Sequence, residues 1–457
     1  PRGAAVVVDP NNGNVLAIVS VPSFNPNTFI PSIKAKDWKA LQKDEADPLV
    51  NRAISALPPG STFKIVTALA GLRRNLANAH YNCSGGVSYG DHYFKCWIAG
   101  KGVHGTLGLA DAIKVSCDSF FYQYGNAATI QSIDAVGKML GIGEESGIHL
   151  TGEQTGIMPG PEWMQVHHPQ ERWSQAQTAN VSIGQGYTLV SPLQLAMAYA
   201  TVANGGVCYY PRFVDRVLNQ DGSPAIDEHG KPYPVVTRVR TDLHREFSAS
   251  QIDIVRKGLW KVVNEDGGTG GRARLKNVVV AGKTGTAQAS DRGHEENVAW
   301  FACFAPYDNP KYVVAVMVQG ASGHGGEVAG PIATRILERI VAQDEEKFDM
   351  PVAWLEPAHH PNPLQLVKSV SYTGSNVGGE DEEGADTSQS GAAQMAADGS
   401  APDVEPEADD QGRVAQKARA PRAQPVAPPP RQPNFFERLF GVKRPAPTPP
   451  PPVRRRQ

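Results

Sequence analysis

A serine and a lysine three residues apart are the first candidates for chemistry in this sequence. Ser61 and Lys64 follow Pro58-Pro59-Gly60, and the residues after them favour a helix. Because Pro-Pro-Gly blocks a helix, we expect the helix to begin at Ser61, with both side chains on one face. A desolvated lysine amine can take the proton of a serine hydroxyl and make it a nucleophile. A helix-capping serine followed by a surface lysine would give the same pattern.

A second serine and a carboxylate form the next candidate pair. Ser116-Cys117-Asp118 follows a stretch with helical apolar spacing. Ser116 can pass a proton to a leaving group, and Asp118 can position the substrate or the amine of Lys64. Taken alone, this motif cannot be distinguished from an ordinary helix cap.

The third candidate is Lys283-Thr284-Gly285-Thr286, at the end of the apolar segment 278–282. A strand edge with glycine at position 285 allows a peptide to lie beside it as an added strand. Lys283 supplies positive charge, and the hydroxyls of Thr284 and Thr286 can bind a carboxylate. The backbone N–H groups of Ser61 and Thr286 can together form an oxyanion hole. An ordinary exit from a strand into a turn is the alternative.

The elements that must position these motifs point to a mixed α/β fold. A hairpin is predicted at the start, because turn residues 9–13 separate two apolar runs, and the region 60–210 is rich in helical patterns. We therefore expect one five-stranded antiparallel sheet with helices on both faces and a helical subdomain. The predicted strands are residues 4–8, 15–21, 277–282, 298–304 and 312–319, and the last helix is 328–341.

Composition divides the 457 residues into two parts. Residues 1–348 read as the folded domain, and 349–457 as a linker and tail. Residues 380–410 contain eleven acidic and no basic residues, and residues 413–456 contain eleven basic residues, one acid and many prolines. Such a segment buries too little apolar surface to fold, so we expect disorder. The short island 434–440 would either fold on a partner or remain a solvated, sticky stretch.

Charge and hydropathy exclude several classes of function. The net charge of −2 gives no basic bias, so nucleic-acid binding is not expected. The sequence has no uninterrupted apolar run of about 18 residues, so none of it is expected to span a membrane. It begins with Pro1 instead of methionine. We therefore expect a fragment whose anchor or export signal lay upstream.

The order of the three motifs resembles that of the penicillin-recognising serine acyltransferases. Further segments narrow the resemblance to the class B penicillin-binding proteins, and within them to the penicillin-binding protein 2 group. Many relatives have asparagine where Asp118 stands, whereas aspartate is familiar in this group. The resemblance covers about residues 1–342 and rests, beyond the motifs, on segments 7–17, 23–27, 51–53, 183–187, 191–194, 283–288 and 304–310.

The resemblance implies a peptidoglycan D,D-transpeptidase that cross-links stem peptides through a Ser61 acyl-enzyme, in cell elongation and shape, and that β-lactam antibiotics acylate. Lys64, Ser116, Asp118 and Lys283 would move or tune the proton, with Thr284, Gly285 and Thr286 binding substrate. It also implies an anchor in the cytoplasmic (inner) membrane, a periplasmic catalytic domain and a SEDS-family glycan polymerase as partner. A D,D-carboxypeptidase, a class D-like β-lactamase and a β-lactam sensor remain as alternatives.

Three cysteines and a histidine form a separate cluster in the sequence. Their spacing is Cys-x12-Cys-x7-His-x12-Cys, and three thiolates with one imidazole make a closed tetrahedral set for a structural zinc ion. Some members of the penicillin-binding protein 2 group, which the sequence resembles, also have metal-ligand residue types at these positions. A disulfide between Cys83 and Cys96, or three inert buried thiols, are the alternatives to zinc, which is the favoured interpretation. The four expected ligands are Cys83, Cys96, His104 and Cys117, with Asp91 and His92 as alternatives and Cys208 and Cys303 as core residues.

Overall fold

The computed structural model describes residues 2–233, 236–291 and 294–345. The predicted tail 349–457, its island 434–440 and the boundary at 348 therefore lie outside the described residues. The helices are α1 (Ala35–Lys43), α2 (Lys64–Arg73), α3 (Leu109–Lys114), α4 (Asp118–Ala128), α5 (Ile130–Met139), α6 (Pro161–His167), α7 (Gln175–Ser182), α8 (Pro192–Ala203), α9 (Ala249–Asn264) and α10 (Gly325–Glu345). Short 3-10 turns are η1 (Pro26–Phe29), η2 (Gly60–Phe63), η3 (Leu243–Arg245) and η4 (Gly271–Ala273).

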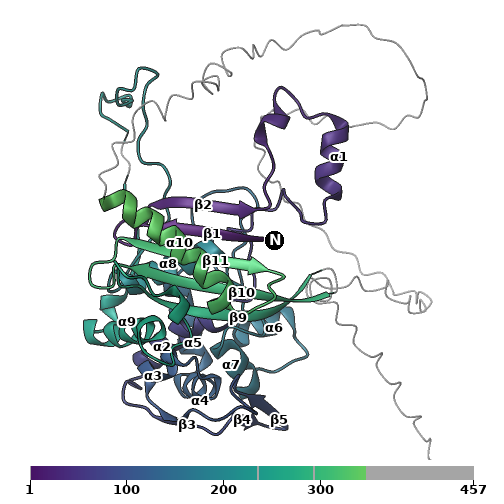
Figure 1. The fold of residues 1–457 in the computed structure, drawn as a ribbon, viewed down its shortest axis with the longest axis vertical. Coiled ribbons are helices and arrows are strands. Elements are labelled where there is room, and N and C mark those ends of the chain that lie inside the picture. Colours follow the sequence, from purple (N-terminus) through teal and green to yellow (C-terminus); the bar gives the residue numbers. More distant parts are fainter. Residues whose placement is uncertain (1, 234–235, 292–293, 346–457) are drawn as a thin grey trace, which may run out of the picture. The chain divides into compact units, whose positions relative to one another are not determined.

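Five antiparallel strands form the main sheet, in the order β2-β1-β11-β10-β9 (Figure 1). They are β1 (Arg2–Val8), β2 (Val15–Val21), β9 (Ala281–Asp291), β10 (His294–Ala305) and β11 (Tyr312–Gln319). The first of these strands pairs with the last, because Arg2 lies opposite Gln319 and Val8 opposite Val313. Within the described ranges, three two-stranded sheets lie outside it: β3 (Tyr81–Cys83) with β6 (Gly105–Leu107), β4 (Gly86–Tyr89) with β5 (His92–Lys95), and β7 (Val207–Tyr209) with β8 (Val239–Asp242).

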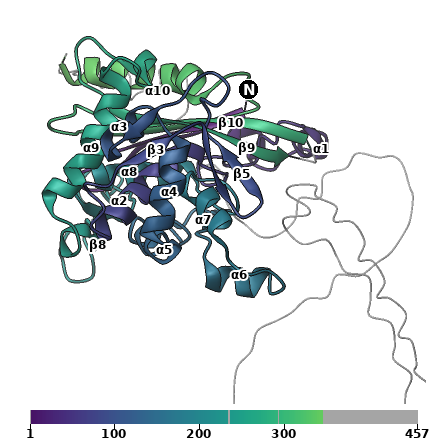
Figure 2. The same ribbon diagram turned by 90° about the horizontal axis from the view of Figure 1, so that it is seen from below.

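Helices cover both faces of the sheet, as the two ribbon views show (Figures 1 and 2). Helix α10 packs on β9, β10 and β11, whereas α8 packs on β1, β10 and β11 from the other side. Every residue of α8 is buried, as expected for a helix that protein surrounds on all sides. The helical subdomain packs α2 against α4 and α5, and α4 against α7. The predicted fold class is confirmed.

The strand that carries Lys283 is longer than the sequence indicates. We predict a strand over residues 277–282 that ends before Lys283, but β9 runs from Ala281 to Asp291. Its ladder with β10 continues through the motif, with Thr284 opposite Phe301 and Thr286 opposite Ala299. The predicted end of the strand at residue 282 is wrong, because a lysine usually marks the end of a buried strand. Lys283 is instead buried within the strand.

The contact between α2 and α4 gives a test of this packing. A methyl group at Gly71 of α2 would overlap the ring of Tyr124 on α4, which is fully buried. We expect Gly71→Ala to lower the free energy of unfolding by about 1–3 kcal/mol, because overpacking outweighs the higher helix propensity of alanine. Urea unfolding would measure the change.

Gly271→Ala, at the start of η4, is the control for Gly71→Ala. A methyl group there would meet no atom within 4 Å beyond its chain neighbours. We expect this variant to be neutral or up to about 1 kcal/mol more stable. Equal stability of the two variants would contradict the tight approach of α2 to α4.

Candidate active site

A cleft of about 900 Å³ runs along β9 and brings the three sequence motifs together. Thr284, Gly285 and Thr286 line it from β9. The facing residues Ser61, Ser116 and Asp118 come from segments distant in the sequence. The sequence therefore places chemically matched residues at three distant positions, and the fold gathers them at one strand edge.

Glycines allow the turn that carries Ser61 to touch β9. Gly60 has φ +55°, and a Cβ atom there would lie 2.6 Å from the carbonyl oxygen of Thr286. A Cβ atom on Gly285 would lie 2.8 Å from the carbonyl oxygen of Pro59. Only glycine fits both the left-handed backbone at position 60 and this close approach. Ser61 therefore lies in the 3-10 turn η2, directly before α2, which begins at Lys64.

The ammonium of Lys64 is fully buried and bonded to the second motif. Its Nζ donates to the carbonyl oxygen of Ser116 at 2.9 Å, to Ser116 Oγ at 3.2 Å and to Asp118 Oδ1 at 2.7 Å. We expect Lys64 to reach Ser61, but these three contacts use the three protons of an ammonium. The amine is therefore bonded to Ser116 and Asp118, and its contact with Ser61 stays a prediction.

Ser116 adopts an unusual backbone conformation. Its φ is +54°, in the left-handed region that residues with a Cβ atom rarely enter. It forms the turn between α3 and α4, where its carbonyl accepts from the Lys64 ammonium. Strain of about 1–3 kcal/mol persists only where surrounding contacts hold it, and such residues concentrate at functional sites.

Asp118 connects the amine to a neighbouring loop. Its Oδ2 accepts from the backbone N–H of Trp97 at 2.9 Å, while Oδ1 binds Lys64. The Trp97 indole donates to the carbonyl of Val115 at 3.1 Å, and its side chain also lines the cleft. We do not predict Trp97 from the sequence, because no local spacing relates it to Asp118.

Lys283 is fully buried behind the cleft, where its Nζ donates to the Thr284 carbonyl at 3.1 Å. Burial holds its pKa well below the usual value, and the positive charge of Lys64 lowers the pKa further. The negative charge of Asp118 acts in the opposite direction. Lys283 is therefore an electrostatic neighbour of the Lys64–Asp118 pair.

The threonines of β9 have fixed partners. Thr286 Oγ1 accepts from the backbone N–H of Gly325, at the start of α10, at 3.2 Å. Thr284 Oγ1 lies 2.9 Å from Oγ1 of Thr269, which also lines the cleft. Thr269 is a second residue that we do not predict from the sequence. The signal that could have found it is the dense glycine segment 267–271 around it.

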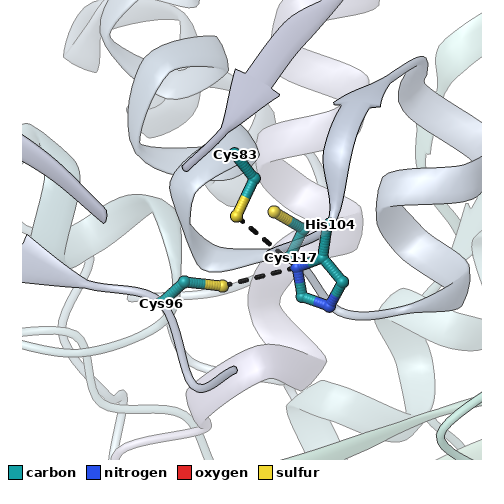
Figure 3. Close-up of side chains that lie close together, drawn as sticks. All are labelled: Cys83, Cys96, His104 and Cys117. Carbon is teal, nitrogen blue, oxygen red and sulfur yellow. Dashed lines mark hydrogen bonds between the residues drawn. The ribbon is translucent and has the colours of Figure 1, made fainter. Parts of the chain in front are cut away.

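The four expected metal ligands lie together beside this site (Figure 3). Their ligand atoms all lie within 4.8 Å of one another, and Sγ of Cys83 and of Cys96 each lie 3.6 Å from His104 Nδ1. All five cysteines are free thiols. The group has no member from Asp91 or His92, whose imidazole packs against Phe94.

A hydrogen bond within the cluster gives the thiols of Cys96 and Cys117 different pKa values. The bond from Cys117 lowers the pKa of Cys96, and the same bond raises the pKa of Cys117. The Sγ atom of Cys117 also accepts from Phe120 N–H at 3.4 Å as the cap of α4. Cys208 and Cys303 are buried outside the cluster, as predicted for core residues.

The position of Lys283 gives a prediction about pH. Its folded pKa is lowered, so it binds fewer protons in the folded than in the unfolded chain between that pKa and about 10.4. Stability is therefore reduced below this window, and this loss is recovered as pH rises through it. We expect Lys283→Met to lack this recovery when urea unfolding is compared at about pH 7 and about pH 9.5.

Lys276→Met, at an exposed position, controls for the loss of a lysine. It should keep the pH dependence of the unaltered protein. If Lys283→Met kept the same dependence as well, a lowered pKa at Lys283 would be contradicted.

Comparisons with known proteins agree with this geometry. The family described as penicillin binding protein transpeptidase domain matches residues 3–338. The chain is 36% identical over 348 residues to the peptidoglycan D,D-transpeptidase MrdA of Acinetobacter baumannii, covering 72% of this chain and 49% of that relative. It therefore spans about half of that relative's length.

Solved structures give the same result. The penicillin-binding protein PBP2 of Helicobacter pylori, in complex with MreC, is 29% identical with a TM-score of 0.64 and covers 75% of this chain and 60% of its own. Penicillin-binding protein A of Mycobacterium tuberculosis, as a ceftriaxone acyl-enzyme, is 26% identical with a TM-score of 0.61 and covers 74% and 73%. The resemblance found in the sequence is confirmed, and this chain belongs to the family of penicillin-binding protein transpeptidase domains.

Proposed function

We propose that this domain is a D,D-transpeptidase that cross-links the stem peptides of peptidoglycan through a Ser61 acyl-enzyme, in cell elongation and shape. One observation carries the proposal: the buried Lys64 amine contacts Ser116 and Asp118 in the cleft that Ser61 lines. A buried lysine that is hydrogen-bonded to a serine of the cleft is suited to moving protons during acyl transfer. The name of the Acinetobacter baumannii relative supports the same reaction.

The acylation step follows from these contacts. Ser61 Oγ attacks the carbonyl carbon between the two terminal D-alanines, and Lys64, which must be deprotonated to act as the base, takes the hydroxyl proton. The N–H groups of Ser61 and Thr286 stabilise the negative oxygen that forms. The C–N bond then breaks, the leaving amine takes a proton from Ser116, and Lys64 returns one to Ser116. The product is an ester of Ser61 and free D-alanine.

The second step completes the transfer. The amine of a neighbouring stem peptide attacks the ester carbonyl, the C–O bond to Ser61 breaks, and the proton lost by the amine returns to Ser61 Oγ through Ser116 and Lys64. The Thr284 and Thr286 hydroxyls hold the terminal carboxylate of the donor, while Lys283 and Asp118 tune the charge of Lys64. A β-lactam carries a carboxylate and a reactive amide, so it acylates the same serine.

Mass spectrometry of the intact protein tests the nucleophile. After incubation with benzylpenicillin we expect one stable adduct on the unaltered domain. Ser61→Ala should slow acylation at least about a thousandfold, because the attacking atom is absent. Ser55→Ala, at a half-buried serine whose hydroxyl bonds the Asn51 carbonyl, is the control and should keep the adduct.

The fate of the drug and of a stem pentapeptide separates the alternatives. Rapid hydrolysis of the drug would favour a β-lactamase, and release of D-alanine without use of an added acceptor amine would favour a carboxypeptidase. An intact drug with no adduct on folded protein would refute Ser61 as the acylated residue.

The whole protein's surroundings are part of the proposal. Among the described residues, none of the helices combines the length and apolarity needed to cross a bilayer. We propose an anchor in the cytoplasmic membrane, a periplasmic position for this domain, and work with a SEDS-family glycan polymerase. The solved complex of the Helicobacter pylori relative with MreC supports membership of a multiprotein assembly.

We also propose a structural zinc ion at Cys83, Cys96, His104 and Cys117. Tetrahedral zinc with sulfur at ~2.3 Å and nitrogen at ~2.0 Å places its ligand atoms ~3.5–3.8 Å apart. The four ligand atoms lie within 4.8 Å of one another, so modest side-chain movements fit them to the ion. When bound, zinc would supply four bonds that join β3, the loop after β5, the residue before β6 and the cap of α4.

Elemental analysis of the purified domain tests the zinc proposal. We expect one zinc per chain in the unaltered protein and in Cys208→Ser, whose cysteine lies outside the cluster. Cys83→Ser should lose the ion, and its melting temperature should fall, because a structural zinc contributes directly to folding. Absence of stoichiometric metal, with three free thiols or a Cys83–Cys96 disulfide, would refute it.

A further inference from the structure

The loop between α9 and η4 adds a hydroxyl to the cleft that none of the three motifs contains. Thr269 Oγ1 lies 2.9 Å from Thr284 Oγ1, and both residues line the cleft. Thr284 is the residue whose hydroxyl the proposed function assigns to the carboxylate of the donor. Thr269 is therefore placed to act on the substrate through Thr284.

Glycines fix the position of Thr269 on both sides. A Cβ atom on Gly270 would lie 2.9 Å from Val262 Cγ1 of α9, and one on Gly326 would lie 2.6 Å from the Thr269 carbonyl oxygen. The loop is thus pressed between α9 and α10 at distances that side chains would prevent. The backbone N–H of Thr269 also donates to the Lys114 carbonyl at 3.4 Å. Its hydroxyl is therefore held by the fold and is not a mobile surface group.

The chemistry of two adjacent hydroxyls determines their useful orientation. If Thr284 donates to Thr269, only oxygen lone pairs of Thr284 can face an anion, which repels it. If Thr269 donates to Thr284, the proton of Thr284 is free to donate to a carboxylate. Hydrogen bonds in such a chain also polarise and strengthen one another. A bound carboxylate therefore selects the second arrangement.

Two charged side chains, Arg272 and Glu327, lie near the hydrogen bond between Thr269 and Thr284. Arg272 and Glu327 line the cleft there, but they form an ion pair with each other at 3.8 Å. Both side chains are largely exposed, so solvent screens them. The threonine hydroxyls add directional donors to these solvent-screened charges for an anion at this place.

We propose that Thr269 is a positioning residue that orients the Thr284 hydroxyl toward the carboxylate of the donor peptide or β-lactam. This inference rests on the proposed acylation of Ser61. It assigns to Thr269 selectivity for acylating agents with a free carboxylate, without contact between Thr269 and the reacting atoms.

Acylation rates with two matched drugs test the inference. Benzylpenicillin carries the carboxylate, and its methyl ester does not. The second-order rate constant for adduct formation would be measured by intact mass for the unaltered domain, Thr269→Val and Thr269→Ser. For Thr269→Val we expect a roughly tenfold lower rate with the acid and a change of less than about twofold with the ester.

The serine variant keeps the hydroxyl, so it should stay within about twofold of the unaltered domain with both drugs. Equal losses for acid and ester in Thr269→Val would assign a merely structural role, and an unchanged rate with the acid would also overturn the inference. If the unaltered, folded domain formed no adduct with the acid, the proposed function itself would fail.

Discussion

The burial of one ammonium group governs how this site is built. Moving Lys64 out of water costs several kcal/mol, and the cost is offset only if Asp118 and the two oxygens of Ser116 are in place. Asp118 begins α4, where the partial positive charge of the helix end also favours its carboxylate. The packing of α2 on α4 and the unusual backbone of Ser116 are therefore requirements of this charge.

The sequence predicts the parts of the fold that depend on local pattern. Two apolar runs separated by a turn predict the β1–β2 hairpin, and β11 was found at its true bounds, whereas the predicted β10 lacks residues 294–297 and 305. The end of β9 was predicted too early, because the sequence does not show that Lys283 is buried within the strand. Trp97 and Thr269 were missed for a related reason. Their roles depend on contacts with Asp118 and Thr284, which only the tertiary fold creates.

The cysteine–histidine cluster shows what residue types and their spacing can predict, and what they cannot. Residue types alone selected the four side chains that the fold brings together, but they did not decide between these and Asp91 or His92. The cluster also borders the catalytic network. Cys96 and Cys117 directly precede Trp97 and Asp118, which share a hydrogen bond. Contacts that fix the positions of Cys96 and Cys117 therefore also fix the hydrogen bond between the Trp97 N–H and the Asp118 carboxylate.

The pairing of β1 with β11 has a consequence for how the chain acquires this fold. Arg2 and Gln319 are neighbours in the sheet although nearly the whole domain separates them in sequence. Contacts of such large sequence separation slow folding. Until β11 is available, one edge of β1 lacks its hydrogen-bonding partner, and unpaired strand edges invite association with other chains. Strand β1 must therefore wait for β11 to be synthesised before this sheet can close.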